Sequence, residues 1–179
     1  MKTSLIVTTI IFLAGAGAFW YFRGPAQNLE VQPPSSSAPI PSLTQTYTDS
    51  AQRFSFNYPE GFTITKVPPV EEGGGKTILV ESPDKKVGIQ ILISPYDSDV
   101  DITETMIRSD IPNMRVTDPQ TVNIGSSRKG LAFMSDNPAF DGASREVWFV
   151  FNTNLYQIST YAEFDELLKG LFGTWQFNK

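Results

Sequence analysis

The chain contains no cysteine and no histidine. Without cysteine it has no disulfide, no thiolate nucleophile, no zinc–thiolate site and no lipobox cysteine for lipid attachment. Without histidine it lacks the commonest general base and the commonest ligand of transition metals. Serine–lysine pairs and paired carboxylates remain possible, but the two absences together argue against an enzyme.

Charge and hydrophobicity narrow the class of protein further. The 179 residues carry 14 basic and 19 acidic side chains, a net charge of −5, which does not fit a nucleic-acid partner. Hydrophobic residues make up 40% of the chain and 13 residues are phenylalanine, which is enough for a packed core. The length is sufficient for one ordinary domain and a smaller segment.

The first 23 residues contain a long apolar run. Residues 5–22 carry no charge, and as a helix they would span about 27 Å, close to the hydrocarbon thickness of a bilayer. The aromatic triplet 19–21 and Arg23 end the run as a membrane boundary would. We expect residues 1–23 to be a single transmembrane anchor whose short N-terminal tail stays in the cytoplasm. The alternative is a signal peptide cleaved among the small residues 14–18, which would give a secreted protein. Both interpretations place the rest of the chain outside the cytoplasm.

Residues 24–46 differ in composition from both neighbours. They contain five prolines and a serine run, with no apolar period. Such segments are extended and solvated. We expect a tether that holds the following domain, residues 47–179, at some distance from the membrane.

The remaining residues have the composition of a globular domain. Several segments alternate between apolar and polar residues, as strands with one buried face do, and short turns separate them. The expected strands are residues 54–58, 77–82 and 87–94 around the turn 83–86, 121–125, 129–135, and 145–152 and 155–162 around Thr153-Asn154.

Two segments have the spacing of helices. Residues 103–111 form a short one, and residues 163–173 a longer one with an apolar stripe at i, i+3, i+4, i+7 and i+8: Phe164, Leu167, Leu168, Leu171 and Phe172. Consecutive strands with short connections imply an antiparallel sheet. The predicted class is α+β, with about six to eight antiparallel strands packed against one long C-terminal helix and one short helix.

The segment YDSDVDITETM, residues 96–106, looks more like a metal-binding or catalytic motif than any other part of the sequence. Asp97, Asp99 and Asp101 occupy positions 1, 3 and 5 of a possible calcium loop, but Ile102 stands where an EF-hand needs glycine and Arg108 where it needs glutamate. A helix start explains the pattern better, with Asp101 as the N-cap and Glu104 completing a capping box. The three aspartates are the only metal candidates, and we expect no metal site.

Other apparent motifs fail on their context. GGGKT (73–77) lacks the first glycine of a phosphate-binding loop and precedes a strand. The Ser-x-x-Lys matches at 82–85 and 126–129 lie in turns instead of on a helix. The acidic pairs 71–72 and 136 with 141 are typical of solvated loops. Trp148 and Trp175 have the pattern of core residues.

The order of these segments resembles a known family. FSFNYPEGF (54–62) is similar to the opening of PsbP-like proteins, relatives of the extrinsic oxygen-evolving protein of photosystem II, and FDELLKGLFGTWQF (164–177) resembles their last helix and the short strand after it. The resemblance implies an α/β/α sandwich and a non-catalytic accessory or assembly role. Because the chain has neither an organelle transit peptide nor histidine, a bacterial membrane-anchored member fits best.

We therefore expect a non-catalytic extracytoplasmic domain that is membrane-tethered through residues 5–22 and binds a protein partner near the membrane. One alternative is a domain that binds a small ligand, or calcium through Asp97, Asp99 and Asp101. The second is a hydrolase that uses loop carboxylates. No cofactor is expected.

Overall fold

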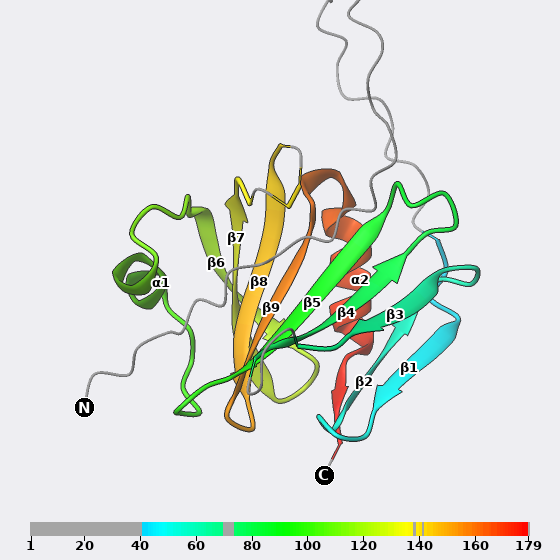
Figure 1. Cartoon of the computed structure of the whole chain (residues 1–179), viewed down its shortest axis with the longest axis horizontal. Coiled ribbons are helices and arrows are strands. Elements are labelled where there is room, and N and C mark those ends of the chain that lie inside the picture. Colours follow the sequence, from blue (N-terminus) through cyan, green and yellow to red (C-terminus); the bar gives the residue numbers. More distant parts are fainter. Residues whose placement is uncertain (1–40, 70–73, 138, 141, 179) are drawn as a thin grey trace, which may run out of the picture.

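The computed structural model describes residues 41–69, 74–137, 139–140 and 142–178. These residues form two antiparallel sheets, with strand orders β1-β2-β10 and β3-β4-β5-β9-β8-β7-β6, and two α-helices (Figure 1). The strands are β1 Gln45–Asp49, β2 Phe54–Tyr58, β3 Thr63–Val67, β4 Lys76–Glu81, β5 Gly88–Pro95, β6 Thr117–Ile124, β7 Arg128–Ser135, β8 Ser144–Phe151, β9 Asn154–Tyr161 and β10 Gln176–Phe177. The helices are α1 Glu104–Asp110 and α2 Asp165–Thr174, the latter preceded by the 3-10 turn η1 Ala162–Phe164.

The predicted α+β class is confirmed. The seven-stranded sheet lies within the predicted range of strands, and both predicted helices form. The separate three-stranded sheet was not anticipated, because its last strand, β10, comes from the far end of the chain and pairs with β2.

Turn chemistry fixes the register of the hairpins. In the β8–β9 connection, Asn152 and Thr153 have φ values of 51° and 55°, as a two-residue hairpin turn with the twist of the flanking strands requires. Phe151 then pairs with Asn154. The predicted turn at Thr153-Asn154 is therefore wrong by one residue: asparagine adopts positive φ more readily than most residues, and it takes the first turn position.

The seven-stranded sheet is packed on both faces. Residues 144–150 of β8 are all buried, so side chains that point to opposite sides of the sheet are covered alike. On one face, Val147, Phe149 and Ile158 belong to a core with α2 and the small sheet. On the other face, Trp148 and Val150 pack with Ile107 of α1 and its neighbours. This arrangement is the predicted α/β/α sandwich.

Aromatic rings hold the small sheet and the end of α2 against the large sheet. Trp175, 1% exposed, stacks on Phe54 of β2 with ring centroids 4.7 Å apart. It also meets Phe149 of β8 edge-on at 5.7 Å. Because offset-stacked and edge-to-face pairs add to the free energy of burial, this cluster joins three parts of the chain at one point.

The N-terminal segments of the sequence lie largely outside the described residues. The expected anchor, residues 1–23, and most of the expected tether fall in residues 1–40. Within the residues that are described, no helix has the length and apolar character needed to cross a membrane. The described chain begins at residue 41; Leu43 already packs against the core and β1 begins at Gln45.

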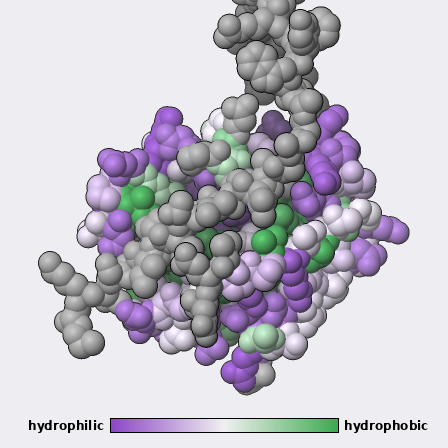
Figure 2. Space-filling model, in the orientation of Figure 1, coloured by the Kyte–Doolittle hydropathy of each residue, from purple (hydrophilic) through white to green (hydrophobic). Residues whose placement is uncertain are grey.

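The visible surface of the domain is mainly polar. On the face shown in Figure 2, hydrophilic residues form most of the rim, and hydrophobic residues gather in small groups between them. Among the described residues, Val100 is the single exposed large hydrophobic side chain, at 44%.

The turn between β6 and β7 approaches the C-terminal end of α2 so closely that only glycine fits. Gly125 has φ +56°, and a Cβ placed there would lie 2.3 Å from the carbonyl oxygen of Trp175. Gly125→Ala should therefore lower the free energy of unfolding by about 2–4 kcal/mol, through left-handed strain and steric overlap.

Urea denaturation of the full chain measures this effect. Gly88→Ala is the matched control, because a Cβ there meets nothing within 4 Å and its φ is not positive. Equal loss of stability in both variants would show that the close approach at Gly125 does not constrain the fold.

Candidate functional site

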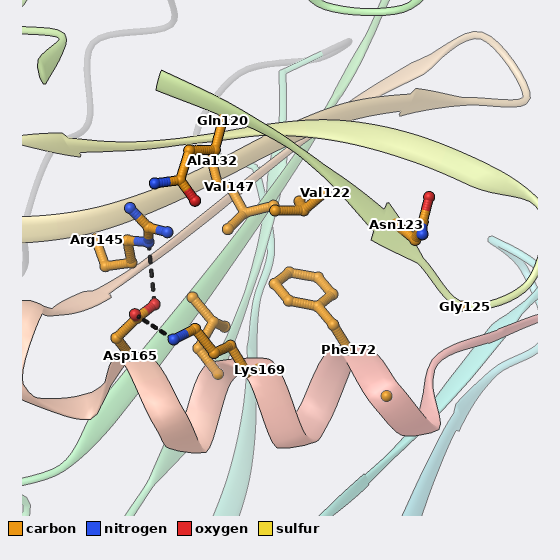
Figure 3. Close-up of a pocket in the computed structure, with 12 residues that line it drawn as sticks. Gln120, Val122, Asn123, Gly125, Ala132, Arg145, Val147, Asp165, Lys169 and Phe172 are labelled. Atoms are coloured by element: carbon orange, nitrogen blue, oxygen red, sulfur yellow. Dashed lines mark ion pairs between the residues drawn. The ribbon is translucent and has the colours of Figure 1, made fainter. Parts of the chain in front are cut away.

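A cavity of about 320 Å³ lies between α2 and the β6–β7–β8 side of the large sheet (Figure 3). We name it the Arg145 pocket. Its lining comprises Gln120, Val122, Asn123, Gly125, Ala132, Arg145, Val147, Asp165, Leu168, Lys169, Phe172 and Gly173. Except for Gly125, which lies in the β6–β7 turn, they come from two walls, one made by strands and one by a helix.

The two-residue period of the strand and the helical period of α2 bring these side chains together. Arg145 and Val147 are two residues apart on β8 and point to the same face of the sheet. On α2 the lining residues follow the spacing i, i+3, i+4 and i+7, which is one stripe of a helix: Asp165, Leu168, Lys169 and Phe172. The inner part of this stripe is the apolar pattern that docks α2 on the sheet.

Arg145 is the central charged group of the pocket. The residue is 8% exposed, and its Nε lies 3.0 Å from Oδ1 of Asp165. The two atoms are not aligned as a hydrogen bond, so Nε has no hydrogen-bond partner within the described part of the chain. Lys169 shares the same carboxylate, with Nζ 3.0 Å from Oδ2 of Asp165. One acidic group thus serves two cations.

Lys169 differs from Arg145 because it lies at the rim. Its side chain is 57% exposed and also contacts Glu166, with Nζ 2.5 Å from Oε1. The hydrogen bonds that Lys169 donates to Glu166 and then to Asp165 raise the pKa of Lys169 above its ordinary value. Lys169 is therefore charged and already paired at neutral pH, whereas the buried guanidinium of Arg145 retains donor capacity.

Beyond this charged end the lining is mainly apolar. Figure 3 shows Phe172 and Val122 there, away from Arg145 and Asp165, with Gln120 beside the guanidinium and Asn123 farther along. Among the lining residues there is no serine, threonine, tyrosine or glutamate, and the one acid, Asp165, is in ion pairs. The lining thus combines a charged end with apolar side chains, as small-molecule sites commonly do.

The three aspartates singled out in the sequence do not converge. Asp99 accepts two hydrogen bonds from Arg128, each 2.9 Å long, so both its carboxylate oxygens are occupied. Asp97 and Asp101 are exposed. Within the described residues, no group of three or more acidic side chains is placed to hold a metal ion.

The predicted helix cap at Asp101 is wrong. Thr103 is the N-cap of α1, and its side chain accepts a hydrogen bond from the backbone N–H of Met106. Glu104 is the first helical residue, where it pairs with Arg108 one turn later. Threonine and aspartate are both good N-cap residues, and the helix starts at the nearer one.

The described residues of the other motifs that the sequence analysis rejected lie in strands and turns, as predicted. Lys76 of GGGKT begins β4. Ser82 and Lys85 form a turn in which the serine hydroxyl donates to Asp84, 2.6 Å away. Ser126 and Lys129 lie at the β6–β7 hairpin. Of the acidic pairs, residues 71–72 and 141 fall outside the described residues.

Glu146 is a buried acid that sequence reasoning missed. It is 1% exposed, and four donors surround its carboxylate: Ser159 at 2.6 Å, Ser144 at 2.8 Å, Asn137 at 3.1 Å and Trp148 at 3.3 Å. Burial raises the pKa of Glu146, and these hydrogen bonds oppose it. The available signal was a single acid in an otherwise apolar central strand.

Comparison with known proteins finds no match by sequence but does find matches by structure. No family model matches the chain, and no curated protein matches it. Solved structures do match. The solution structure of cyanobacterial PsbP (CyanoP) from Synechocystis aligns with a TM-score of 0.50 at 12% identity, covering 79% of this chain and 97% of that one.

A second neighbour is a crystal structure from Bacteroides thetaiotaomicron. It aligns with a TM-score of 0.52 at 16% identity, over 77% of this chain and 50% of that one. At such identities the likeness concerns the fold alone. The chain has a PsbP-like fold, and the predicted resemblance is confirmed at that level.

The buried Glu146 predicts how stability depends on pH. Because its pKa in the folded state lies above the unfolded value of about 4.3, the folded state keeps its full stability below that pH and loses some as pH rises through the folded pKa. Glu146→Gln removes this titration. Relative to the variant, the melting temperature of the wild-type chain should fall by a few degrees between pH 4 and pH 8.

Thermal unfolding at several pH values tests this. Glu60→Gln, an exposed position in a turn, is the control for a change of net charge. A difference between wild type and Glu146→Gln that stays constant with pH would mean that Glu146 does not titrate with an elevated pKa.

Proposed function

We propose that this protein is a non-catalytic, extracytoplasmic accessory domain that binds a protein partner through the Arg145 pocket and the adjoining edge of β6. In this proposal residues 1–23 anchor the chain in a membrane, and the segment between residue 23 and β1, which begins at Gln45, tethers the domain. The observation that carries the proposal is the pocket itself, whose lining is suited to binding and which lies beneath an edge strand. A PsbP-like fold fits such an accessory role.

The edge strand gives a partner a place to pair. β6 is the last strand in the order of the large sheet, so no strand of the described chain pairs with its outer side. Residues 118–121 are exposed. Edge strands present unpaired backbone N–H and C=O groups, which extended segments of partner proteins use.

The first residues of β6 are irregular, which protects this part of the edge from pairing with strands of unrelated proteins. The register with β7 shifts between Thr117 and Gln120, and Asp118 has φ +51°. Pro119 also removes a backbone donor there. Bulges and prolines are the usual protections of sheet edges. They leave residues 120–124, which lie over the pocket, as the regular part of the edge.

In this proposal the tether supports partner binding because it confines the domain near one membrane. A domain held near one membrane meets partners in that membrane at a high effective concentration, so a modest interface is enough for stable association. This explains how a small pocket and one short edge can suffice.

Site-specific photo-crosslinking in the native cells tests the proposal. A crosslinking amino acid replaces Asn123, an exposed residue on the regular part of the β6 edge next to the pocket, and leaves Arg145 unchanged. We expect a discrete crosslinked protein in the membrane fraction. The same amino acid at Thr65, an exposed residue on β3 at the opposite edge of the sheet, should give none.

Two outcomes would contradict the proposal. Crosslinks of equal yield from both positions would show that the β6 edge is not the binding surface. Recovery of the full chain in the soluble fraction, with the same distribution after deletion of residues 1–23, would show that the segment is not an anchor.

A further inference from the structure

We propose that the Arg145 pocket recognises a single carboxylate carried on a short apolar group. This inference rests on the proposed function, because it names the chemical group that the same pocket takes. It is carried by the state of Arg145, by the size of the cavity and by the division of its lining into a polar and an apolar end.

The contacts of Arg145 only partly offset the free-energy cost of burying its guanidinium. Removing a guanidinium from water is costly unless the group is paired and hydrogen-bonded. Here the described counter-charge is Asp165, which Lys169 shares, and the Nε of Arg145 lacks a hydrogen-bond partner within the described residues. A guanidinium has five N–H donors, and a carboxylate can accept two of them side by side. A carboxylate bound in the cavity would give the guanidinium a counter-charge that it does not share with Lys169.

Gln120 adds a neutral donor at the same end. Its side chain lies beside the guanidinium in Figure 3, on the strand wall opposite Lys169. An amide can donate to one carboxylate oxygen while Arg145 holds the other. Arg145 and Gln120 thus define a binding position for two oxygens.

The charge of the pocket favours a monoanion. Arg145 is the one buried cation of the lining, and near the mouth the two negative charges of Asp165 and Glu166 face the single positive charge of Lys169. A second negative charge on the ligand, as on a phosphate dianion, would be repelled by these acids without another free cation to balance it. A carboxylate carries one charge only.

The remainder of the cavity sets the size of the ligand. Val122, Val147 and Phe172 line the cavity next to its charged end. A cavity of about 320 Å³ lies at the lower end of the range for small-molecule sites. The ligand is therefore a carboxylate joined to a small branched or aromatic group, such as a short carboxylic acid or the C-terminal valine or leucine of a protein.

Titration of the purified full chain with isovalerate tests the inference, and isovaleramide, which has nearly the same shape without the charge, is the control. We expect saturable shifts of the Arg145 Nε–Hε signal in NMR spectra, with a Kd of about 1 mM or lower for the acid. The amide should bind at least about tenfold more weakly. Absence of saturation with the acid, or equal binding of acid and amide, would overturn the proposal.

A pair of variants on one strand separates the pocket from general charge effects. Gln120→Glu places a carboxylate beside Arg145 and should weaken isovalerate binding at least about tenfold. Thr121→Glu makes the same change of net charge at the next, exposed residue, whose side chain points to the opposite face of the sheet. It should leave the affinity within about twofold. Equal weakening by both variants would also overturn the proposal.

The tripeptide Gly-Gly-Val, as free acid and as C-terminal amide, distinguishes the two sources of the carboxylate. Tighter binding of the peptide acid than of isovalerate identifies a protein C-terminus, and the reverse identifies a small acid; both support carboxylate recognition. If isovalerate binds and the Asn123 crosslink is absent, the partner hypothesis fails alone. If the crosslink forms and no carboxylate binds, this inference fails alone.

Discussion

The structure depends on a sheet whose central strands are buried on both faces. β8 and β9 carry large apolar side chains in alternation with others that are equally covered, so each face needs its own layer. α2 and the small sheet provide one layer, fastened by the stack of Trp175 on Phe54. α1 provides the other, through Ile107 against Trp148. Without either layer, part of the core would be exposed to water.

The same requirement produces the pocket. α2 covers its face of the sheet with Leu167, Leu168, Leu171 and Phe172, while its first residue, Asp165, reaches Arg145 at one end of β8. The helix and the edge strand β6 enclose a space that side chains do not fill. A buried arginine at the end of such a space is costly for stability. The proposed carboxylate ligand would offset part of that cost.

The elements could be predicted from the sequence where periodicity is strong. Alternation identified β4, β5 and β9, a short apolar run before the Asn-Thr turn identified β8, and the apolar stripe identified α2. Local choices between similar residues could not be made: Asp101 and Thr103 are both good N-caps, and only the structure shows which one caps α1. The candidate site was beyond prediction, because Arg145 looks like the polar start of a strand until α2 is docked on it. The buried site of Glu146 could not be predicted from the sequence either, because its four hydrogen-bond donors come from distant residues and from its own strand.

The central claim is that the β6 edge and α2 together form the binding surface. Hydrogen–deuterium exchange tests it most directly, comparing the full chain purified with its partner from native membranes against the chain produced alone in a heterologous host. The account predicts slower exchange in residues 117–124 and 165–174 when the partner is bound, with β3 and α1 unchanged. Slower exchange confined to α1 or β3, or no difference anywhere, would contradict it.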